Sequence, residues 1–197
     1  RFIKDLPVKF VRSKGMLPLP KPKKGSSLEL LRPFLNLPDE DSWCLFVADL
    51  VGSLRDRGPY PILITQGEQG SAKSTLSRIK RSLIDPNSAP LRTTPREERD
   101  LMIAARNGWV LSFDNLSGLS NKLSDALCRL STGGGFGCRQ LYSDSEEELF
   151  DAQRPVCLNG IDEIGTRGDL RDRAIILHLP IIEDNKRRDE KTFWKNF

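Results

Sequence analysis

The sequence is poor in the residues that build metal sites and disulfide-rich secreted folds. It contains one histidine and four cysteines, and no two cysteines form a C-x-x-C pair. This spacing argues against a structural zinc site. Scattered reduced cysteines are typical of intracellular proteins, so we expect a cytoplasmic protein from a bacterium or from the host of a virus.

Long apolar segments are missing as well. No uninterrupted apolar run approaches the roughly 18 residues of a membrane-spanning helix, so we expect no membrane partner. The start, RFIKDLPVKF, lacks the apolar core of a signal peptide, and the sequence has no initiator methionine. We therefore expect a piece of a longer protein. The 197 residues are enough for one large domain with an extension.

The net charge of +4 is unevenly distributed along the chain. Residues 1–24 contain eight Lys or Arg and one Asp, whereas the remainder contains 23 positive and 26 negative side chains. A basic segment on a near-neutral body indicates contact with nucleic acid or another acidic surface. A solvated tail explains the same charges, and the charge pattern alone leaves both interpretations open.

Composition divides the chain into four parts. Residues 1–25 are a basic extended segment that ends in a Pro/Lys-rich linker, and residues 26–58 contain N-terminal helices, the second ending at Gly58. Residues 59–182 alternate between strand and helix patterns, and residues 183–197 begin a C-terminal helical region that is cut short.

Within residues 59–182 the apolar patterns alternate between strands and helices. Strands are predicted over 60–67, 109–114, 154–160 and 173–180, helices over 72–84, from a capping box at Thr94–Glu97 to about Gly108, and from Ser120 to about Ser131, and a hairpin over 133–153. This alternation predicts an α/β fold with a parallel sheet covered by helices on both faces.

A glycine-rich loop joins the first strand to the first of these helices. It follows the phosphate-loop pattern, Gly, four residues, then Gly-Lys-Ser/Thr, except that Ala replaces the second Gly. Its N–H groups and the helix N-terminus would bind phosphate, and the Lys side chain would bridge the terminal phosphates of ATP. The candidate nucleotide-binding residues are Gly67, Gln69, Gly70, Ser71, Ala72, Lys73, Ser74 and Thr75.

The loop raises two questions, whether Ala72 disrupts it and whether it binds a nucleotide at all. We expect Ala72 to be tolerated, because the residue before the lysine enters the helix, where Ala is favoured. A simple Gly/Ser turn between strand and helix is the alternative to a nucleotide site.

Asp114, at the end of a second apolar strand, is the candidate second ligand for a Mg²⁺ ion at the loop. Together with the Ser74 hydroxyl, its carboxylate would complete a magnesium shell. Hydrolytic enzymes of this class often have Glu directly after this Asp as the base, but here the residue is Asn115, which cannot act as a base. Glu68, Asp162 and Glu163 are the alternatives.

Two further motifs add candidate residues to the loop and Asp114. Asn159 ends a strand and would hydrogen-bond the terminal phosphate or the attacking water, although Asn-Gly is also a turn signal. Arg171 and Arg173 precede the last strand, where ring-forming ATPases place an arginine that reaches the neighbouring subunit's phosphate. Surface arginines paired with Asp169 and Asp172 explain the same pattern.

The order of loop, strand-end Asp, strand-end Asn and Arg before the last strand resembles the AAA+ ATPase core. The block from Leu127 to Ile182, LCRLSTGGGFGCRQLYSDSEEELFDAQRPVCLNGIDEIGTRGDLRDRAIILHLPII, narrows the resemblance to the superfamily 3 helicase domains of viral and prophage primase-helicases. The resemblance covers about residues 60–182. It departs from the family at Ala72, at Asn115, and where Gly134-Gly135-Phe136 replaces the frequent Gly-Gly-Asp.

The resemblance implies a P-loop NTPase (AAA+-like) fold with an N-terminal helical and extended extension. It further implies an ATP- and Mg²⁺-dependent homo-oligomer, a hexameric ring in the full-length protein, that acts on single-stranded DNA. In that family the hairpin faces the central channel, so Phe136, Arg139 and Tyr142 would contact DNA through stacking and phosphate pairing. Alternatively, the aromatic residues anchor the hairpin and Arg139 pairs with the acidic run 144–148.

Three other functions fit parts of the sequence. An ATP-gated assembly switch without unwinding activity is favoured by Asn115. A small P-loop kinase is weakened by the absence of an Arg-rich lid between strands. A structural domain with a degenerate loop is the remaining alternative.

Overall fold

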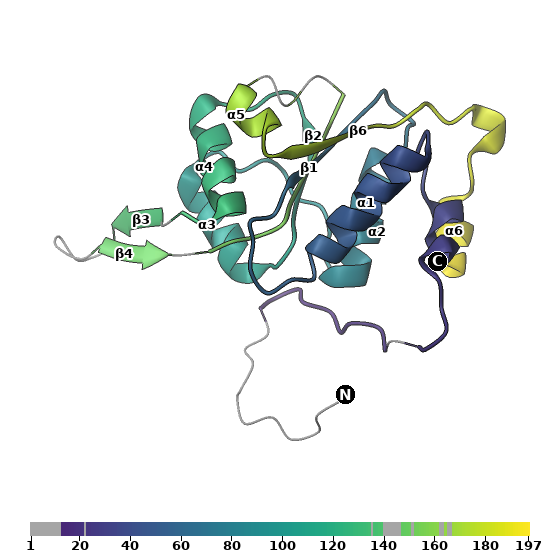
Figure 1. The fold of residues 1–197 in the computed structure, drawn as a ribbon, viewed down its shortest axis with the longest axis horizontal. Coiled ribbons are helices and arrows are strands. Elements are labelled where there is room, and N and C mark those ends of the chain that lie inside the picture. Colours follow the sequence, from purple (N-terminus) through teal and green to yellow (C-terminus); the bar gives the residue numbers. More distant parts are fainter. Residues whose placement is uncertain are drawn as a thin grey trace.

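The computed structural model describes residues 13–21, 23–134, 136–139, 147–150, 152–161, 164 and 167–197, with the backbone alone at 136–139 and 147–150. The elements follow the chain as η1 (Leu28–Phe34), α1 (Glu40–Gly52), β1 (Ile62–Gln66), α2 (Lys73–Ile84), α3 (Glu98–Asn107), β2 (Leu111–Leu116), α4 (Asn121–Thr132), β3 (Phe136–Arg139), β4 (Glu147–Phe150), β5 (Val156–Gly160), α5 (Gly168–Arg171), β6 (Ala174–His178), η2 (Asp184–Lys186) and α6 (Glu190–Asn196) (Figure 1).

Four parallel strands form the central sheet in the order β2–β5–β1–β6. β1 pairs with β5 on one side and with β6 on the other, so that Ile62 lies opposite both Val156 and Ala174. Every residue of β1 and β5 is buried. Strands that are buried on both faces require helices on both sides, and the predicted sheet flanked by helices is confirmed.

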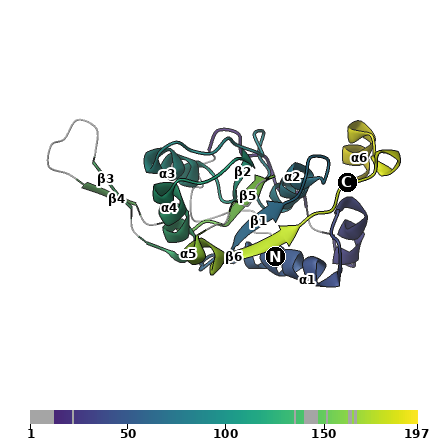
Figure 2. The same ribbon diagram turned by 90° about the horizontal axis from the view of Figure 1, so that it is seen from above.

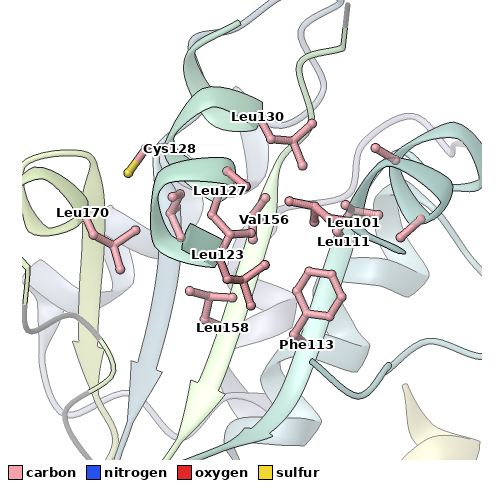
Figure 3. Close-up of a cluster of buried hydrophobic side chains, with 14 of the residues drawn as sticks. Leu101, Leu111, Phe113, Leu123, Leu127, Cys128, Leu130, Val156, Leu158 and Leu170 are labelled. Atoms are coloured by element: carbon pink, nitrogen blue, oxygen red, sulfur yellow. The ribbon is translucent and has the colours of Figure 1, made fainter. Parts of the chain in front are cut away.

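Alternate strand residues point into two separate hydrophobic cores. On one face, Ile62 and Ile64 of β1 pack with side chains of α3, α4 and α5, including Leu101, Leu127 and Leu170 (Figure 3). On the other face, an equally apolar cluster joins the sheet to α1 and α2, with Phe46, Leu63, Leu76 and Cys157 among its members. The sheet is therefore the middle of three layers.

Of two helix boundaries predicted from capping and stop signals, one is confirmed and one moved in the structure. α4 begins as expected, because the Ser120 side chain accepts a hydrogen bond from the N–H of Leu123. By contrast, α1 ends at Gly52 and not at Gly58. The indole N–H of Trp109 donates to the carbonyl of Ser53, and this tertiary bond holds the chain in a loop that returns to β1.

The predicted capping box at Thr94–Glu97 is wrong. α3 begins at Glu98, and its N-cap residue Glu97 makes no side-chain capping bond. The preceding chain is extended because Arg92 pairs with the outer edge of β2. Its N–H donates to the carbonyl of Ser112, and its carbonyl accepts from the N–H of Asp114. A sheet contact therefore overrides the local helix signal.

The predicted hairpin is present as β3 and β4, which pair antiparallel and stand away from the central sheet (Figures 1 and 2). Part of the N-terminal segment folds back on the core, since the N–H of Leu17 donates to the carbonyl of Pro86 and Ser13 donates to the carbonyl of Asn107. Among the described helices, none has the length and apolarity needed to cross a bilayer.

A buried ion pair joins the two helices on the second face of the sheet. Lys80 Nζ of α2 lies 2.6 Å from Asp49 Oδ2 of α1, and their side chains are 0% and 1% exposed. Removing one member of a buried pair leaves an uncompensated charge in an apolar environment. The pair therefore fixes α1 against the helix that carries the phosphate loop.

We expect Asp49→Ala to lower the free energy of unfolding by about 3–5 kcal/mol, because it strands the Lys80 ammonium. The double variant Asp49→Leu/Lys80→Met should recover most of this loss, since no charge is then buried. Urea unfolding followed by circular dichroism measures both, with the exposed Asp56→Ala as control. A double variant no more stable than Asp49→Ala would contradict this account.

Candidate nucleotide-binding site

The carboxyl ends of the parallel strands bring the predicted site residues to one edge of the sheet. The register places Thr65 of β1 opposite Asn159 of β5. Asp114 lies near the end of β2 on the other side of β5. The glycine-rich loop leaves the end of β1 and leads directly into α2. Ligands of open α/β sheets bind at such an edge.

The backbone of the loop requires glycine at its first position. Gly67 has a φ of 149°, and a Cβ atom there would lie 2.5 Å from the carbonyl oxygen of Leu179. Any side chain at Gly67 would therefore push β1 away from the segment that follows β6. The glycine is needed for this close backbone approach.

Ala72 does not have the helical conformation that we expected from the sequence. Its φ of 65° and ψ of 27° lie in the left-handed region, and α2 begins only at the next residue. In this region the Cβ atom is too close to the following carbonyl oxygen, at a cost of roughly 1–2 kcal/mol for a residue other than glycine. Ala72, where the loop pattern has Gly, thus strains the backbone of the loop.

The Lys73 ammonium lies within the loop. Its Nζ donates to the carbonyl oxygens of Gly67 and Glu68, at 2.6 and 2.8 Å, and to Ser71 Oγ at 3.3 Å. Partial burial lowers the pKa of Lys73, and the carboxylate of Asp114 opposes this shift. A cation held by loop carbonyls at a helix N-terminus is well suited to bind phosphate.

A hydrogen-bonded network connects α2 to the ends of β2 and β5. Ser74 Oγ donates to Asp114 Oδ1 over 3.0 Å, and Asn159 Nδ2 donates to the same oxygen over 3.1 Å. The oxygen of the Asn159 amide accepts hydrogen bonds from Thr65 Oγ1 at 2.5 Å and from Ser77 Oγ at 2.9 Å. Because two hydroxyl donors fix the amide oxygen, the amide nitrogen must face Asp114.

The structure excludes the turn interpretation of Asn159, and its role toward a phosphate or water stays a prediction. The residue lies inside β5 with a fully buried side chain, so it is not a turn residue. Sequence reasoning missed the two hydroxyls that orient it. Ser77 is one helical turn after Ser74 and lies on the same face of α2, which is a readable signal. Thr65 is recognisable only from the strand register.

The oxygen atoms of Ser74 and Asp114 are the ligands that Mg²⁺ prefers. They converge from two different elements beside Lys73, and the chemistry of this donor pair fits a magnesium ion bound with nucleotide phosphates. The carboxylate is half-buried, so additional ligands from solvent can reach it.

Asn115 has the second left-handed backbone among the described non-glycine residues, with a φ of 57°. The pairing of β2 with β5 is irregular between Phe113 and Leu116, on either side of this residue. Asn tolerates this conformation better than Glu does. Of the alternative bases, Glu68 is exposed, whereas Asp162 and Glu163 lie outside the described residues.

The two predicted arginines are not brought to this edge. Arg173 directly precedes Ala174, which pairs with Ile62 at the opposite end of β1 from the loop. A strand of this length separates the two ends by roughly 15 Å. Arg173 Nη1 donates to the carbonyl of Asp169, and Arg171 ends the short helix α5. Neither arginine is placed to contact a phosphate in its own chain's loop.

The candidate DNA-binding residues are described only in part. Phe136 and Arg139 begin and end β3, but only their backbone is described. Tyr142 lies outside the described residues. Their contact with DNA therefore stays a prediction.

A cleft of about 720 Å³ opens beside the phosphate loop. It lies between η1, the start of α2 and the segment that contains η2 and α6, and its lining includes Phe34, Asn36, Thr75, Ile182, Arg187 and Trp194. Gly70 and Ala72 of the loop border the same cleft. The site thus combines a phosphate loop with an adjoining cavity that has aromatic and polar walls, large enough for a nucleoside.

Residues 28–197 match the sequence model of the replication proteins of actinomycete integrative conjugative elements. The chain belongs to this family. No curated protein matches the sequence. The family description gives a conjugative element as the context of these replication proteins.

Two solved structures, one of them a helicase, share the fold. The C-terminal region of NrS-1 has a TM-score of 0.57 at 13% identity and covers 98% of this chain and 46% of its own. JCV helicase has a TM-score of 0.53 at 10% identity and covers 79% and 46%. The chain therefore spans less than half the length of these proteins. The P-loop NTPase fold (AAA+-like) that we expected, a parallel sheet flanked by helices, is shown.

We expect Ala72→Gly to raise the free energy of unfolding by about 0.5–1 kcal/mol. It relieves the left-handed strain, which outweighs the greater entropy of an unfolded glycine. Ala48→Gly, an exposed position within α1, is the matched control and should lose about 1 kcal/mol. Urea unfolding compares the two, and a loss of stability in Ala72→Gly would contradict the left-handed assignment.

Proposed function

We propose that this chain is the ATP-binding and hydrolysing motor domain of a DNA helicase of the superfamily 3, replicative primase-helicase type. The full-length protein would act as a ring, a hexamer, on single-stranded DNA. The observation that carries the proposal is the network of Ser74, Asp114 and Asn159 beside the Lys73 loop. Membership in a family of replication proteins supports the same context.

In this proposal the loop binds the phosphates of the nucleotide and the cleft binds its nucleoside. The loop N–H groups and Lys73 hold the β- and γ-phosphates, because a helix N-terminus and a cation both attract negative charge. The adjoining cleft, which Thr75 helps to line, takes the nucleoside. A magnesium ion held by Ser74 and Asp114 neutralises phosphate charge when it is bound.

In this proposal Asn159 positions the Asp114 carboxylate and responds to the terminal phosphate through it. Its amide is held by Thr65 and Ser77, so any shift of Asp114 on nucleotide binding is transmitted to β5 and β1. The buried amide has no alternative orientation that keeps all of these hydrogen bonds. This rigidity suits a residue that distinguishes nucleotide states.

The position of the two arginines supports ATP hydrolysis at a boundary between two subunits. Since Arg171 and Arg173 are a strand length away from their own loop, they can stabilise phosphate charge only in a neighbouring subunit. In a ring each subunit would supply an arginine to the next. Hydrolysis would then require assembly.

Asn115 favours the second candidate, an ATP-gated assembly switch. The position after Asp114 is exposed and left-handed, and its amide cannot take a proton from water. A base from elsewhere, such as Glu68, is needed for rapid turnover. A protein that binds ATP and assembles without turnover would fit the same site.

The first test is steady-state ATP hydrolysis by the full-length protein, with and without single-stranded DNA. We expect DNA to stimulate turnover. Lys73→Ala should lower turnover by about 10²-fold or more, because it removes a hydrogen-bond donor that would stabilise the negative charge of the transition state. Lys122→Ala, an exposed lysine in α4, is the control. Tight ATP binding without hydrolysis under any condition would reject the helicase and leave the switch.

Mixing experiments test the arginines. We expect Arg171→Ala/Arg173→Ala to lose most turnover, by up to roughly 10³-fold or more. Adding Lys73→Ala, which retains its arginines, should restore part of the activity because each mutant supplies what the other lacks. Arg167→Ala is the matched control, since this residue pairs with Asp125. Failure of the mixture to gain activity would argue against catalysis between subunits.

A further inference from the structure

Two carbonyl groups of the glycine-rich loop accept hydrogen bonds from segments at the two ends of the chain. The N–H of Ile182, in the segment that follows β6, donates to the carbonyl of Gly70 at 3.3 Å. Asn36, which follows η1, donates from Nδ2 to the carbonyl of Ser71 at 3.1 Å and to that of Pro180 at 2.6 Å. One side-chain amide therefore joins the N-terminal segment, the loop and the segment after the last strand.

The orientation of the Asn36 amide follows from its two partners. Both are carbonyl oxygens, which only accept hydrogen bonds, so the NH₂ group of the amide must face them. Leu35 and Leu37, on either side of Asn36, pack against the hydrophobic core that joins the sheet to α1 and α2. The two leucines thus hold the backbone of Asn36 in place while its side chain reaches the loop.

The hydrogen bond from Asn36 fixes the peptide group between Ser71 and Ala72. The C=O and the N–H of a trans peptide point in opposite directions. Because Asn36 holds the carbonyl of Ser71, the N–H of Ala72 faces away from Asn36. Backbone N–H groups next to a left-handed residue and at a helix N-terminus are the donors that bind phosphate in such loops.

The conformation of Ala72 makes this support important. Its φ of 65° lies in the left-handed region, which glycine adopts freely and alanine does not. Such a conformation persists only where the surrounding structure fixes it. The angle φ of Ala72 describes the rotation of the Ser71–Ala72 peptide about the N–Cα bond, so a hydrogen bond that holds this peptide opposes relaxation of Ala72 to an ordinary conformation.

We propose that Asn36 is a positioning residue of the nucleotide loop. By holding the carbonyl of Ser71, it keeps Ala72 left-handed and directs the Ala72 N–H toward the phosphates of the nucleotide. The inference rests on the proposed function, because it requires a nucleotide in the loop. It gives the N-terminal segment, which lies outside the glycine-rich motif, a direct part in nucleotide binding.

Calorimetric titration of the full-length protein with ADP tests this role. We expect Asn36→Ala to weaken ADP binding by roughly 10-fold, as for the loss of two hydrogen bonds between neutral groups. Ser27→Ala is the matched control, because it removes the side chain that caps η1 and leaves the loop contacts intact. It should bind ADP as the wild type does.

The decisive comparison repeats Asn36→Ala in the Ala72→Gly background. There it should weaken ADP binding by about 3-fold or less, because glycine keeps the left-handed conformation without support. Asn36→Gln keeps both donors on a longer side chain and should fall between the wild type and Asn36→Ala. Thermal unfolding without nucleotide establishes that each variant is folded, and Asn36→Gln carries the comparison of the two backgrounds if Asn36→Ala is not.

The outcomes separate this inference from the proposed function. Wild-type protein that binds no ADP would overturn both. Wild-type affinity in Asn36→Ala would overturn only the role of Asn36. An equal loss in the two backgrounds, or a Ser27→Ala variant as weak as Asn36→Ala, would mean that Asn36 acts only by holding η1 in place, and would likewise overturn its role at the loop.

Discussion

The alignment of three parallel strands is the constraint on which the candidate site depends. β5 lies between β1 and β2, so its strand-end Asn159 is flanked by Thr65 on one side and by Asp114 on the other. The loop that leaves β1 then carries Ser74 to the same carboxylate. A shift of one residue in this register would move Asn159 to the opposite face of the sheet and dissolve the network.

Backbone strain is concentrated at the same edge. Among the described residues other than glycine, Ala72 and Asn115 have positive φ, and they lie on the two sides of the Ser74–Asp114 contact. Such conformations persist only where the surrounding structure fixes them. Here the fixing elements are the sheet and α2, which the buried Asp49–Lys80 pair also connects to α1. Helix α2, which follows the glycine-rich loop, is therefore held by α1 as well as by the sheet.

The N-terminal element η1 and the C-terminal helix α6 together form one wall of the cleft beside the loop. η1 and α6 are far apart in sequence, but their aromatic rings pack together and close one side of the cleft. Asn36, which follows η1, and Arg187, which precedes α6, both lie at the loop. The candidate nucleotide site is therefore built from the sheet core and from both flanking segments.

The sequence by itself determined the layered fold and predicted where the candidate site lies. Apolar strands alternating with amphipathic helices require a covered parallel sheet, and the loop pattern with Lys73 and Ser74 predicts the edge at which phosphate would bind. Only the tertiary structure decided that Asn159 is a buried hydrogen-bonding residue, that Ala72 is left-handed, and that α3 starts after an extended pairing at Arg92. Each of these depends on partners distant in sequence, and a local pattern carries no information about such partners. The same holds for Arg187, whose contact with Gly70 exists because the chain crosses back over the loop after the last strand.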